Sequence, residues 1–252
     1  MRVLAIDTSG DHGVVAITDG GEVRAELHAR ARSRHGETLL PAIERALGMA
    51  ELTIADVELI AIGLGPGSFT GVRIGVSTAK GLALARRTPL VGVRTTRVIA
   101  RGLPGALRVP VVDAHKGEVF VAVYEAEEDG TLRARWGETH GAPDVAGRMV
   151  RDALAGAQGS EAARPVIAGS GLGAYRDAFL DALGAPYLVA PRAFDVPRGA
   201  LLALEGEEAL AARGPDDVGA LEPLYVRASG ALLPASSPGA ALRAGAVPEA
   251  DR

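Results

Sequence analysis

The chain has 252 residues, a formal net charge of −4 at neutral pH and no cysteine, which excludes disulfides and thiolate metal sites. No apolar run approaches the roughly 20 residues of a membrane-spanning helix, and Met1 leads into an apolar segment without a leader pattern, so we expect a cytoplasmic protein. Independent nucleic-acid binders usually carry a basic surplus. Any RNA contact is therefore expected to need a partner.

The first hundred residues predict three strands followed by alternating helices and strands. Val3 to Asp7 is apolar, and the turn at residues 19–21, Asp-Gly-Gly, predicts a hairpin between the next two strands. Pro41 is tolerated in the first predicted helix because it lies near the first turn. The expected segments are strands 3–7, 13–18, 22–30, 59–64 and 90–93, helices 38–47 and 70–85, and a short connection at 54–57. This order indicates a mixed sheet.

A glycine-proline-glycine loop at residues 65–67 leads directly into the helix 70–85. Ser68 or Thr70 can cap this helix by accepting a hydrogen bond from its first free N–H groups. A glycine loop before a helix N-terminus suits an anion, although neither a Gly-Lys-Ser/Thr sequence nor GxGxxG is present. The alternative is a tight strand-to-helix turn beside a packing helix, and the loop by itself favours that alternative.

The second half of the chain predicts a smaller α/β unit after a hinge at residues 103–105. Strands 109–113 and 118–126 form a second hairpin, and the last predicted helix is expected to pack back toward the first unit. The predicted helices are 144–154, 175–183 and 198–213. We therefore expect an N-terminal lobe, 1–103, a C-terminal lobe, 104–228, and a flexible tail, 229–252, which is rich in Ala, Gly, Pro and Ser.

Ordered blocks along residues 1–228 resemble the TsaB (YeaZ) family, the smaller paralogue of the TsaD (Gcp) family. The longest is GLGPGSFTGVRIGVSTAKGLALARRTPLVG at 63–92. The others are LAIDTSGDHGVVAI at 4–17, HGETLLP at 35–41, VVDAHKGEVF at 111–120, AGSG at 168–171 and PLYVR at 223–227. Such blocks in order are far more specific than any one of them.

The resemblance implies an actin-like fold (ASKHA, ribonuclease H-like), with two lobes whose mixed sheets are flanked by helices. It implies a non-catalytic dimerisation or scaffold subunit for synthesis of tRNA N6-threonylcarbamoyladenosine (t6A). This subunit would bind and activate a metal-dependent TsaD-type transferase, its catalytic paralogue. A TsaE-type P-loop ATPase would join them, and tRNA would be contacted only through the complex. The isolated chain, as a monomer or homodimer, would hold no cofactor, with ATP or ADP bound only in the complex.

The strongest functional signal is a missing metal site. In the TsaD family, the helix after the corresponding strand carries an HxxxH pair that binds the catalytic metal, because histidines four apart share a helical face. In this register Thr95 and Ile99 take those positions. The family's C-terminal Asp-Asn segment also has no counterpart between Leu221 and Tyr225. The resemblance thus implies a scaffold that has lost its metal ligands.

A second class of function, a stand-alone actin-like small-molecule kinase or ATPase, is the alternative. Actin-like phosphotransferases place a magnesium-linked carboxylate near the position of Asp7, although an aspartate ending a strand often hydrogen-bonds its own turn. Against this alternative, the second lobe offers only residues 169–171 as another phosphate loop. A third class, a peptidase, is not supported, because the sequence contains no metal motif, no cysteine and no serine–histidine constellation. The candidates for a cleft or nucleotide-facing surface are Asp7, Asp11, Gly65, Gly67, Ser68 and Asp113.

The predicted partner surface consists of the helices 38–47 and 70–85. Each carries two apolar rows, although a helix on one side of a sheet needs only one, and an uncovered row commonly marks an interface. Two helices from each paralogue would form a four-helix bundle. The alternative is that both rows are internal core. The candidate interface residues are Leu39, Leu40, Ile43, Leu47, Gly71, Val72, Gly75, Val76 and Ala79.

Overall fold

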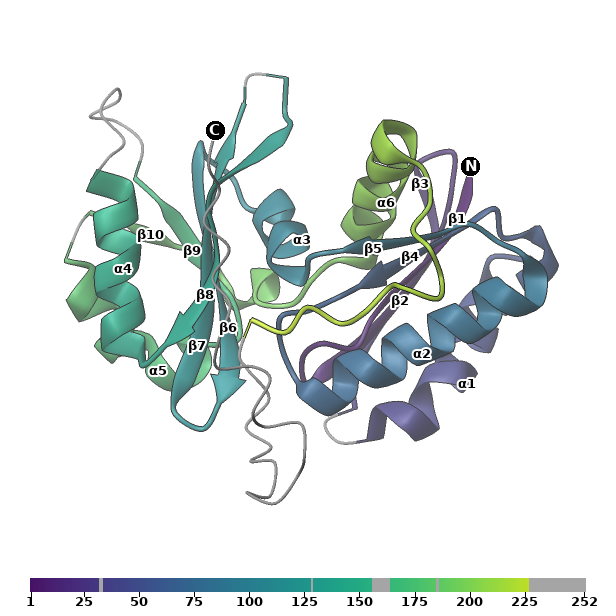
Figure 1. Ribbon diagram of the computed structural model, residues 1–252, viewed down its shortest axis with the longest axis horizontal. Helices are drawn as coiled ribbons and strands as arrows, with labels where there is room; N and C mark the ends of the chain where they lie inside the picture. The colour runs from purple at the N-terminus through teal and green to yellow at the C-terminus, as the bar shows by residue number, and fades with distance from the viewer. Residues whose placement is uncertain (32–33, 128, 156–163, 185, 227–252) are drawn as a thin grey trace, which may run out of the picture.

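A computed structural model describes residues 1–31, 34–127, 129–155, 164–184 and 186–226, which form two lobes, each built on a five-stranded mixed sheet (Figure 1). The predicted tail, 229–252, lies outside the described residues. Within the described ranges, no helix has the length and apolarity that crossing a lipid bilayer requires.

The first lobe has the strand order β3-β2-β1-β4-β5. β1 pairs antiparallel with β2 and β2 with β3, whereas β4 runs parallel to β1 and β5 to β4. Helices α1 and α2 cover one face of the sheet, and α6 covers the other (Figure 1). Its elements are β1 Arg2–Asp7, β2 His12–Asp19, β3 Glu22–Arg30, α1 His35–Met49, the 3-10 helix Ile54–Asp56, β4 Leu59–Gly63, α2 Phe69–Arg86, β5 Leu90–Val93 and α6 Gly199–Arg213.

Strand β1 shows how the sequence sorts the two faces of this sheet, because successive side chains of a strand point to opposite sides. Leu4 and Ile6 pack in the core beneath α1 and α2. Val3 and Ala5 pack on the other side with Leu202 of α6. All five side chains are fully buried. Burial on both faces explains the continuous apolar run that predicted this strand.

The second lobe repeats the arrangement with the strand order β10-β9-β6-β7-β8. β6, β7 and β8 are antiparallel neighbours, and β9 and β10 extend the sheet in parallel. Helices α4 and α5 cover the outer face, while α3 lies against the inner face, between the lobes (Figure 1). The repeated topology confirms the predicted actin-like α/β fold. The elements are α3 Thr95–Gly102, β6 Leu107–His115, β7 Glu118–Ala126, β8 Leu132–Gly141, α4 Pro143–Ala155, β9 Val166–Ala168, α5 Leu172–Leu183, β10 Leu188–Val189 and the 3-10 helix Arg192–Phe194.

Several elements differ from the sequence-based prediction: α3, β8, β9 and β10 are absent from it, and α1 and α5 each begin three residues earlier than predicted. Strand β8 is absent from it because LRARWGETHG is mainly polar; the strand forms the edge of its sheet and most of its side chains are exposed or half-buried. Helix α1 begins at His35 rather than Thr38. The buried ring of His35 donates from Nε2 to the carbonyl oxygen of Gly10 at 2.9 Å, which fixes the start of this helix against the loop after β1.

After α6, the chain runs alongside α2 toward the second lobe (Figure 1). We call residues 214–226 the C-terminal segment. Lys80 of α2 donates to two of its carbonyl oxygens, at 3.0 and 3.1 Å. The N–H of Leu224 donates to the carbonyl oxygen of Leu64 at 2.8 Å, and Val226 packs against the inner face of the second lobe. The segment is therefore held by both lobes.

Candidate functional site

A hollow of about 310 Å³ lies between the two lobes. Its walls come from the loop after β1, from α3, from the turn between β6 and β7 and from the linker that precedes α6. Aspartates, arginines and histidines all contribute to the lining, so its charge is mixed. The lining residues that bear on function are Asp11, Arg30, Thr95, Ile99, Asp113 and Asp195.

Two predicted cleft residues, Asp11 and Asp113, line this hollow. Asp11 lies 3.8 Å from the guanidinium of Arg30. Asp113 accepts a hydrogen bond from the backbone N–H of His115 at 2.7 Å, within the β6–β7 turn. The Asp113 contact is that of an aspartate that stabilises its own turn, whereas Asp11 faces an arginine at the end of β3.

Asp7 has to be removed from the cleft-facing set, because it is fully buried at the end of β1. Its Oδ1 accepts from the N–H and hydroxyl of Ser9 at 2.8 and 2.6 Å, and its Oδ2 accepts from the hydroxyl of Thr95 at 2.7 Å. Burial raises the pKa of the Asp7 carboxyl above its ordinary value, because the charged form loses its hydration. A methyl group on Gly63 would lie 2.0 Å from Oδ2. Asp7 thus ties β1 to α3 in a space too small for a bound metal.

The loop at Gly65, Gly67 and Ser68 packs against the chain instead of opening toward a ligand. Ser68 is the N-cap of α2, where its Oγ accepts from the N–H of Gly71 at 3.3 Å. Its own N–H donates to the carbonyl oxygen of Ser9 at 2.6 Å, and a methyl group on Gly67 would lie 2.2 Å from that oxygen. An anion site needs free N–H groups, whereas this helix start faces a carbonyl. The loop is therefore the tight turn of the packing alternative.

Thr95 and Ile99 both line the hollow from α3. The Thr95 hydroxyl is engaged by Asp7, and Ile99 packs with Val112 and Phe120 of the second lobe. Across the ranges that the structure describes, no group of three or more His, Asp or Glu side chains is arranged to hold a metal ion. Neither Thr95 nor Ile99 therefore presents a free metal-ligating group to the hollow.

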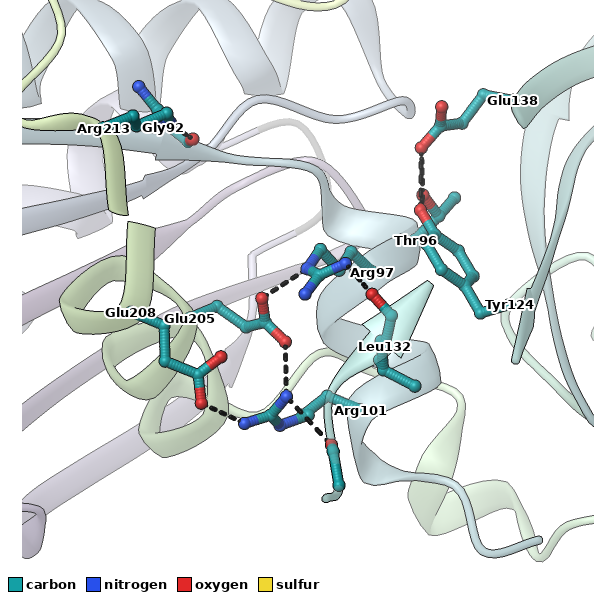
Figure 2. A network of polar contacts seen from close by, with 11 residues as sticks. Gly92, Thr96, Arg97, Arg101, Tyr124, Leu132, Glu138, Glu205, Glu208 and Arg213 are labelled. Atoms are coloured by element: carbon teal, nitrogen blue, oxygen red, sulfur yellow. Dashed lines mark hydrogen bonds and ion pairs between the residues drawn. The ribbon is translucent and has the colours of Figure 1, made fainter. Parts of the chain in front are cut away.

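The opposite side of α3 carries a polar network that no sequence motif indicated (Figure 2). Arg97 forms an ion pair with Glu205 of α6 and donates to the carbonyl oxygen of Leu132 in β8 at 2.7 Å. Arg101 reaches the same carboxylate at 3.4 Å and also pairs with Glu208. Glu205 is only 3% exposed. Its charge is tolerated there because two guanidinium groups of α3 face it.

A second part of the network joins α3 to the sheet of the second lobe (Figure 2). The Thr96 hydroxyl donates to Oε1 of Glu138 at 2.6 Å, and the Tyr124 hydroxyl donates to the same oxygen at 3.0 Å. Arg94 pairs with the other carboxylate oxygen. Burial, followed by the nearby Glu138 charge, raises the pKa of Tyr124, so its hydroxyl stays a donor. Helix α3 is thereby braced against both lobes.

The predicted interface on α2 needs correction, because its glycine stripe faces inward. A methyl group on Gly71 would lie 2.2 Å from the carbonyl oxygen of Thr8, and one on Gly75 would lie 2.3 Å from the Thr8 hydroxyl. Small residues here let α2 approach the end of β1, as the internal-core alternative proposes. The predicted residues of α2 are all buried within the lobe: Gly71, Val72, Gly75, Val76 and Ala79.

Of the four predicted interface residues on α1, only one has an exposed side chain. Leu39, Ile43 and Leu47 are buried against the sheet, whereas Leu40 is 51% exposed. An apolar groove of about 370 Å³ follows α1 on its outer side. It is lined by Leu40, Ile43, Glu44, Leu47, Gly48, Leu52, Ile54 and Leu82.

The outward row of α2 consists of small residues that the sequence analysis did not single out. Ser77, Gly81 and Ala85 are exposed and recur at four-residue spacing. A methyl group added to Gly81, or to Gly48 on α1, would meet nothing within 4 Å. We call the groove together with Ser77 and Gly81 the outer helical face. This face is a part of the two predicted helices that is open to another protein.

Comparison with known proteins gives consistent matches. Residues 27–228 match the family described as TsaD, tRNA N6-adenosine threonylcarbamoyltransferase. The chain is 32% identical to the tRNA threonylcarbamoyladenosine biosynthesis protein TsaB of Bacillus subtilis, over 90% of this chain and 94% of that protein. It is 41% identical to the TsaB protein of Escherichia coli, where the match spans 52% of this chain and 58% of the relative.

Among solved structures, the chain is similar to YeaZ from Pseudomonas aeruginosa. The TM-score is 0.73 at 25% identity, covering 89% of this chain and all of that one. A second structure from Pseudomonas aeruginosa, described by its similarity to peptidase YeaZ, gives a TM-score of 0.74 over 90% of this chain.

Proposed function

The chain belongs to the TsaB (YeaZ) family of tRNA threonylcarbamoyladenosine biosynthesis proteins, within the wider TsaD family, and from this premise we propose that it is a non-catalytic scaffold subunit of t6A synthesis. It would bind the metal-dependent TsaD-type transferase and hold it in an active arrangement. The interlobe hollow is the observation that carries this proposal. Thr95 and Ile99 occupy the α3 positions that line it, and neither supplies a metal ligand comparable to imidazole.

The closed glycine loop and the buried Asp7 also favour a non-catalytic subunit over a kinase or ATPase. A kinase or ATPase of this fold needs free N–H groups for phosphate oxygens and an accessible carboxylate for magnesium. Here the start of α2 faces the carbonyl oxygen of Ser9, and Asp7 is enclosed by Ser9, Thr95 and Gly63. The chain would therefore act through its surface, with no cofactor in isolation and with ATP or ADP only in the complex.

The outer helical face is the proposed docking surface for the transferase. Its groove is mainly apolar, and its lining includes the exposed Leu40 of α1 and Leu82 of α2. Open space above Gly48 and Gly81 permits close approach of another helix. A paralogue with the same two helices would complete a four-helix bundle. The same face would serve a homodimer when the transferase is absent.

The remaining partners follow from the family. A TsaE-type P-loop ATPase would join the pair in the cytoplasm, and tRNA would be contacted indirectly through the complex. A net charge of −4 agrees with an indirect role in tRNA binding.

Reconstitution tests the scaffold role. The purified chain is combined with the transferase paralogue, the ATPase and the enzyme that makes threonylcarbamoyl-adenylate, and modified tRNA is quantified. We expect no product from the chain alone and loss of product when the chain is omitted. Transfer by the single protein, or full activity without it, would contradict the proposal.

The docking surface is tested by Gly81→Arg, with Gly137→Arg on the exposed edge strand of the second lobe as its matched control. A methyl group at either glycine meets nothing within 4 Å, so both variants are expected to fold. Gly81→Arg should weaken binding to the transferase about tenfold or more, because it places a charge in a desolvated contact. Gly137→Arg should bind as the wild type does. Equal binding by both variants would exclude this face.

A further inference from the structure

An arginine that contacts two neighbouring aromatic residues lies at the start of α2. The guanidinium carbon of Arg73 is 3.8 Å from the ring centroid of Phe69, one helical turn earlier, and 5.7 Å from that of Tyr225 in the C-terminal segment. Its Nε donates to the Tyr225 hydroxyl at 2.9 Å. The two rings lie 5.6 Å apart. We call these three residues the Arg73 cluster.

The C-terminal segment holds the cluster in place. Leu224, next to Tyr225, donates to the carbonyl oxygen of Leu64 at 2.8 Å, and Lys80 grips the same segment from α2. The cation–π contact and the Nε hydrogen bond then restrict the rotamers of Arg73. An arginine ordered before binding loses less side-chain entropy when a ligand arrives.

The outer edge of this guanidinium remains available. Its Nε is used by Tyr225, while the terminal nitrogens have no carboxylate within ion-pair distance among residues 1–226 as described. Arg97 and Arg101, by contrast, are both committed to Glu205. Phe69 and Tyr225 stay 47% and 43% exposed beside Arg73. A planar donor edge flanked by accessible rings suits a carboxylate bound through two parallel hydrogen bonds.

The surroundings favour a carboxylate of a protein over the phosphates of a nucleic acid. A polyanion is bound by several cations along its track. Here the exposed neighbours of Arg73 on α2, Thr70 and Ser77, are uncharged, and the C-terminal segment adds the exposed carboxylate of Glu222. Arginine with exposed aromatic residues is also the composition of binding hot spots between proteins.

We propose that Arg73 is a preorganised receptor for an acidic side chain of the protein that docks on the outer helical face. The inference rests on the proposed function. Arg73, Ser77 and Gly81 follow one another at four-residue spacing along α2, so the receptor continues the same face. The groove would supply apolar contact area, and Arg73 would fix the register of the partner.

The test measures binding of the transferase paralogue to full-length variants by calorimetry at low and high salt. Arg73→Gln should weaken binding about 10- to 100-fold and reduce its salt dependence, since a charge-assisted contact is lost. Arg73→Lys keeps the charge without the planar fork of donors, so its affinity should lie between those of the wild type and Arg73→Gln. Tyr225→Phe frees Nε while leaving the ring and the guanidinium, so its loss should be clearly smaller than that of Arg73→Gln. Melting curves check that each variant is folded.

The outcomes separate the two proposals. If Arg73→Gln binds at wild-type strength while Gly81→Arg does not, the receptor is refuted and the docking face stands. If the wild-type chain fails to bind the transferase, both fall. Equal losses for Tyr225→Phe and Arg73→Gln would show that Arg73 only anchors the C-terminal segment. A loss of tRNA binding without a loss of transferase binding would assign the site to phosphate and overturn the proposal. Recovery of Arg73→Glu binding by one Asp→Lys or Glu→Lys variant of the transferase would establish it.

Discussion

The same substitution at two glycines of α2 should have opposite effects on stability. Gly75→Ala and Gly81→Ala both replace the residue with the poorest helix propensity, apart from proline, by the residue with the best. Gly81 lies on the outward row, where the new methyl group meets nothing within 4 Å. Gly75 lies on the inward row, where it would be 2.3 Å from the Thr8 hydroxyl and 3.3 Å from Ile62. Only the position of the row distinguishes the two variants.

The magnitudes follow from these contacts. Gly81→Ala should raise the free energy of unfolding by about 0.8–1 kcal/mol, the helix-propensity difference. Gly75→Ala gains the same amount, but it displaces Thr8, whose hydroxyl donates to the carbonyl of Gly71 at 2.7 Å. Overpacking costs about 1–3 kcal/mol, and a lost buried hydrogen bond costs about another 1–3 kcal/mol. The net effect of Gly75→Ala should be a loss of about 1–5 kcal/mol.

Urea unfolding followed by circular dichroism measures both differences. A change of 1 kcal/mol corresponds to roughly 2–4 °C in melting temperature for a chain of this size. In a Thr8→Ala background, Gly75→Ala should cost about 1–2 kcal/mol less, because the crowding oxygen is gone. A Gly75→Ala protein at least as stable as the wild type would refute the assignment of this row to the core. So would a cost unchanged by Thr8→Ala.

Three further outcomes are expected. Glu205→Gln should lower the free energy of unfolding by about 3 kcal/mol in urea titration, because Arg97 loses its buried charged partner. A change below about 0.5 kcal/mol would show that the ion pairs between α3 and α6 do not stabilise the fold. Asp7→Asn removes a carboxyl whose pKa burial raises above its ordinary value, so the stability of the wild type relative to the variant should fall as pH rises above about 3.8; parallel stability–pH curves would contradict this. Elemental analysis after chelator treatment should find no stoichiometric transition metal, since Thr95 and Ile99 replace the expected ligands, and one zinc or iron per chain would contradict it.

The fold could be predicted because its signals are local. The buried strand at Val3 to Asp7 is a continuous apolar run, and Asp19-Gly20-Gly21 fixes the following hairpin. Strand β8 escaped prediction because an edge strand buries little and needs no apolar alternation. Its place is set by pairing with β7, which no window of its own sequence encodes.

The candidate interface could be predicted only to the level of two helices. Gly71, Gly75 and Ala79 share the four-residue spacing of Ser77, Gly81 and Ala85, so periodicity does not reveal which row faces the sheet. The row that faces the sheet is the one containing Gly71 and Gly75, because the carbonyl and hydroxyl of Thr8 lie directly against these two glycines. That contact joins positions far apart in sequence, and it appears only when β1 and α2 are packed together.

The polar network around α3 also depends on contacts between residues far apart in the sequence, and these contacts bear on function. Arg97 and Glu205 are 108 positions apart, and each alone reads as an ordinary surface charge. Together with Glu138 and Tyr124 they hold α3 against α6 and the second sheet. Many enzymes close domains over their substrate, whereas a scaffold gains from rigidity because less entropy is lost on docking. In this chain the hollow side of α3 offers a threonine engaged by a buried aspartate and a packed isoleucine. The other side of α3 is engaged in ion pairs and hydrogen bonds with α6 and the second sheet. Both sides therefore favour a molecule that presents a fixed surface to its partner over one that closes on a substrate.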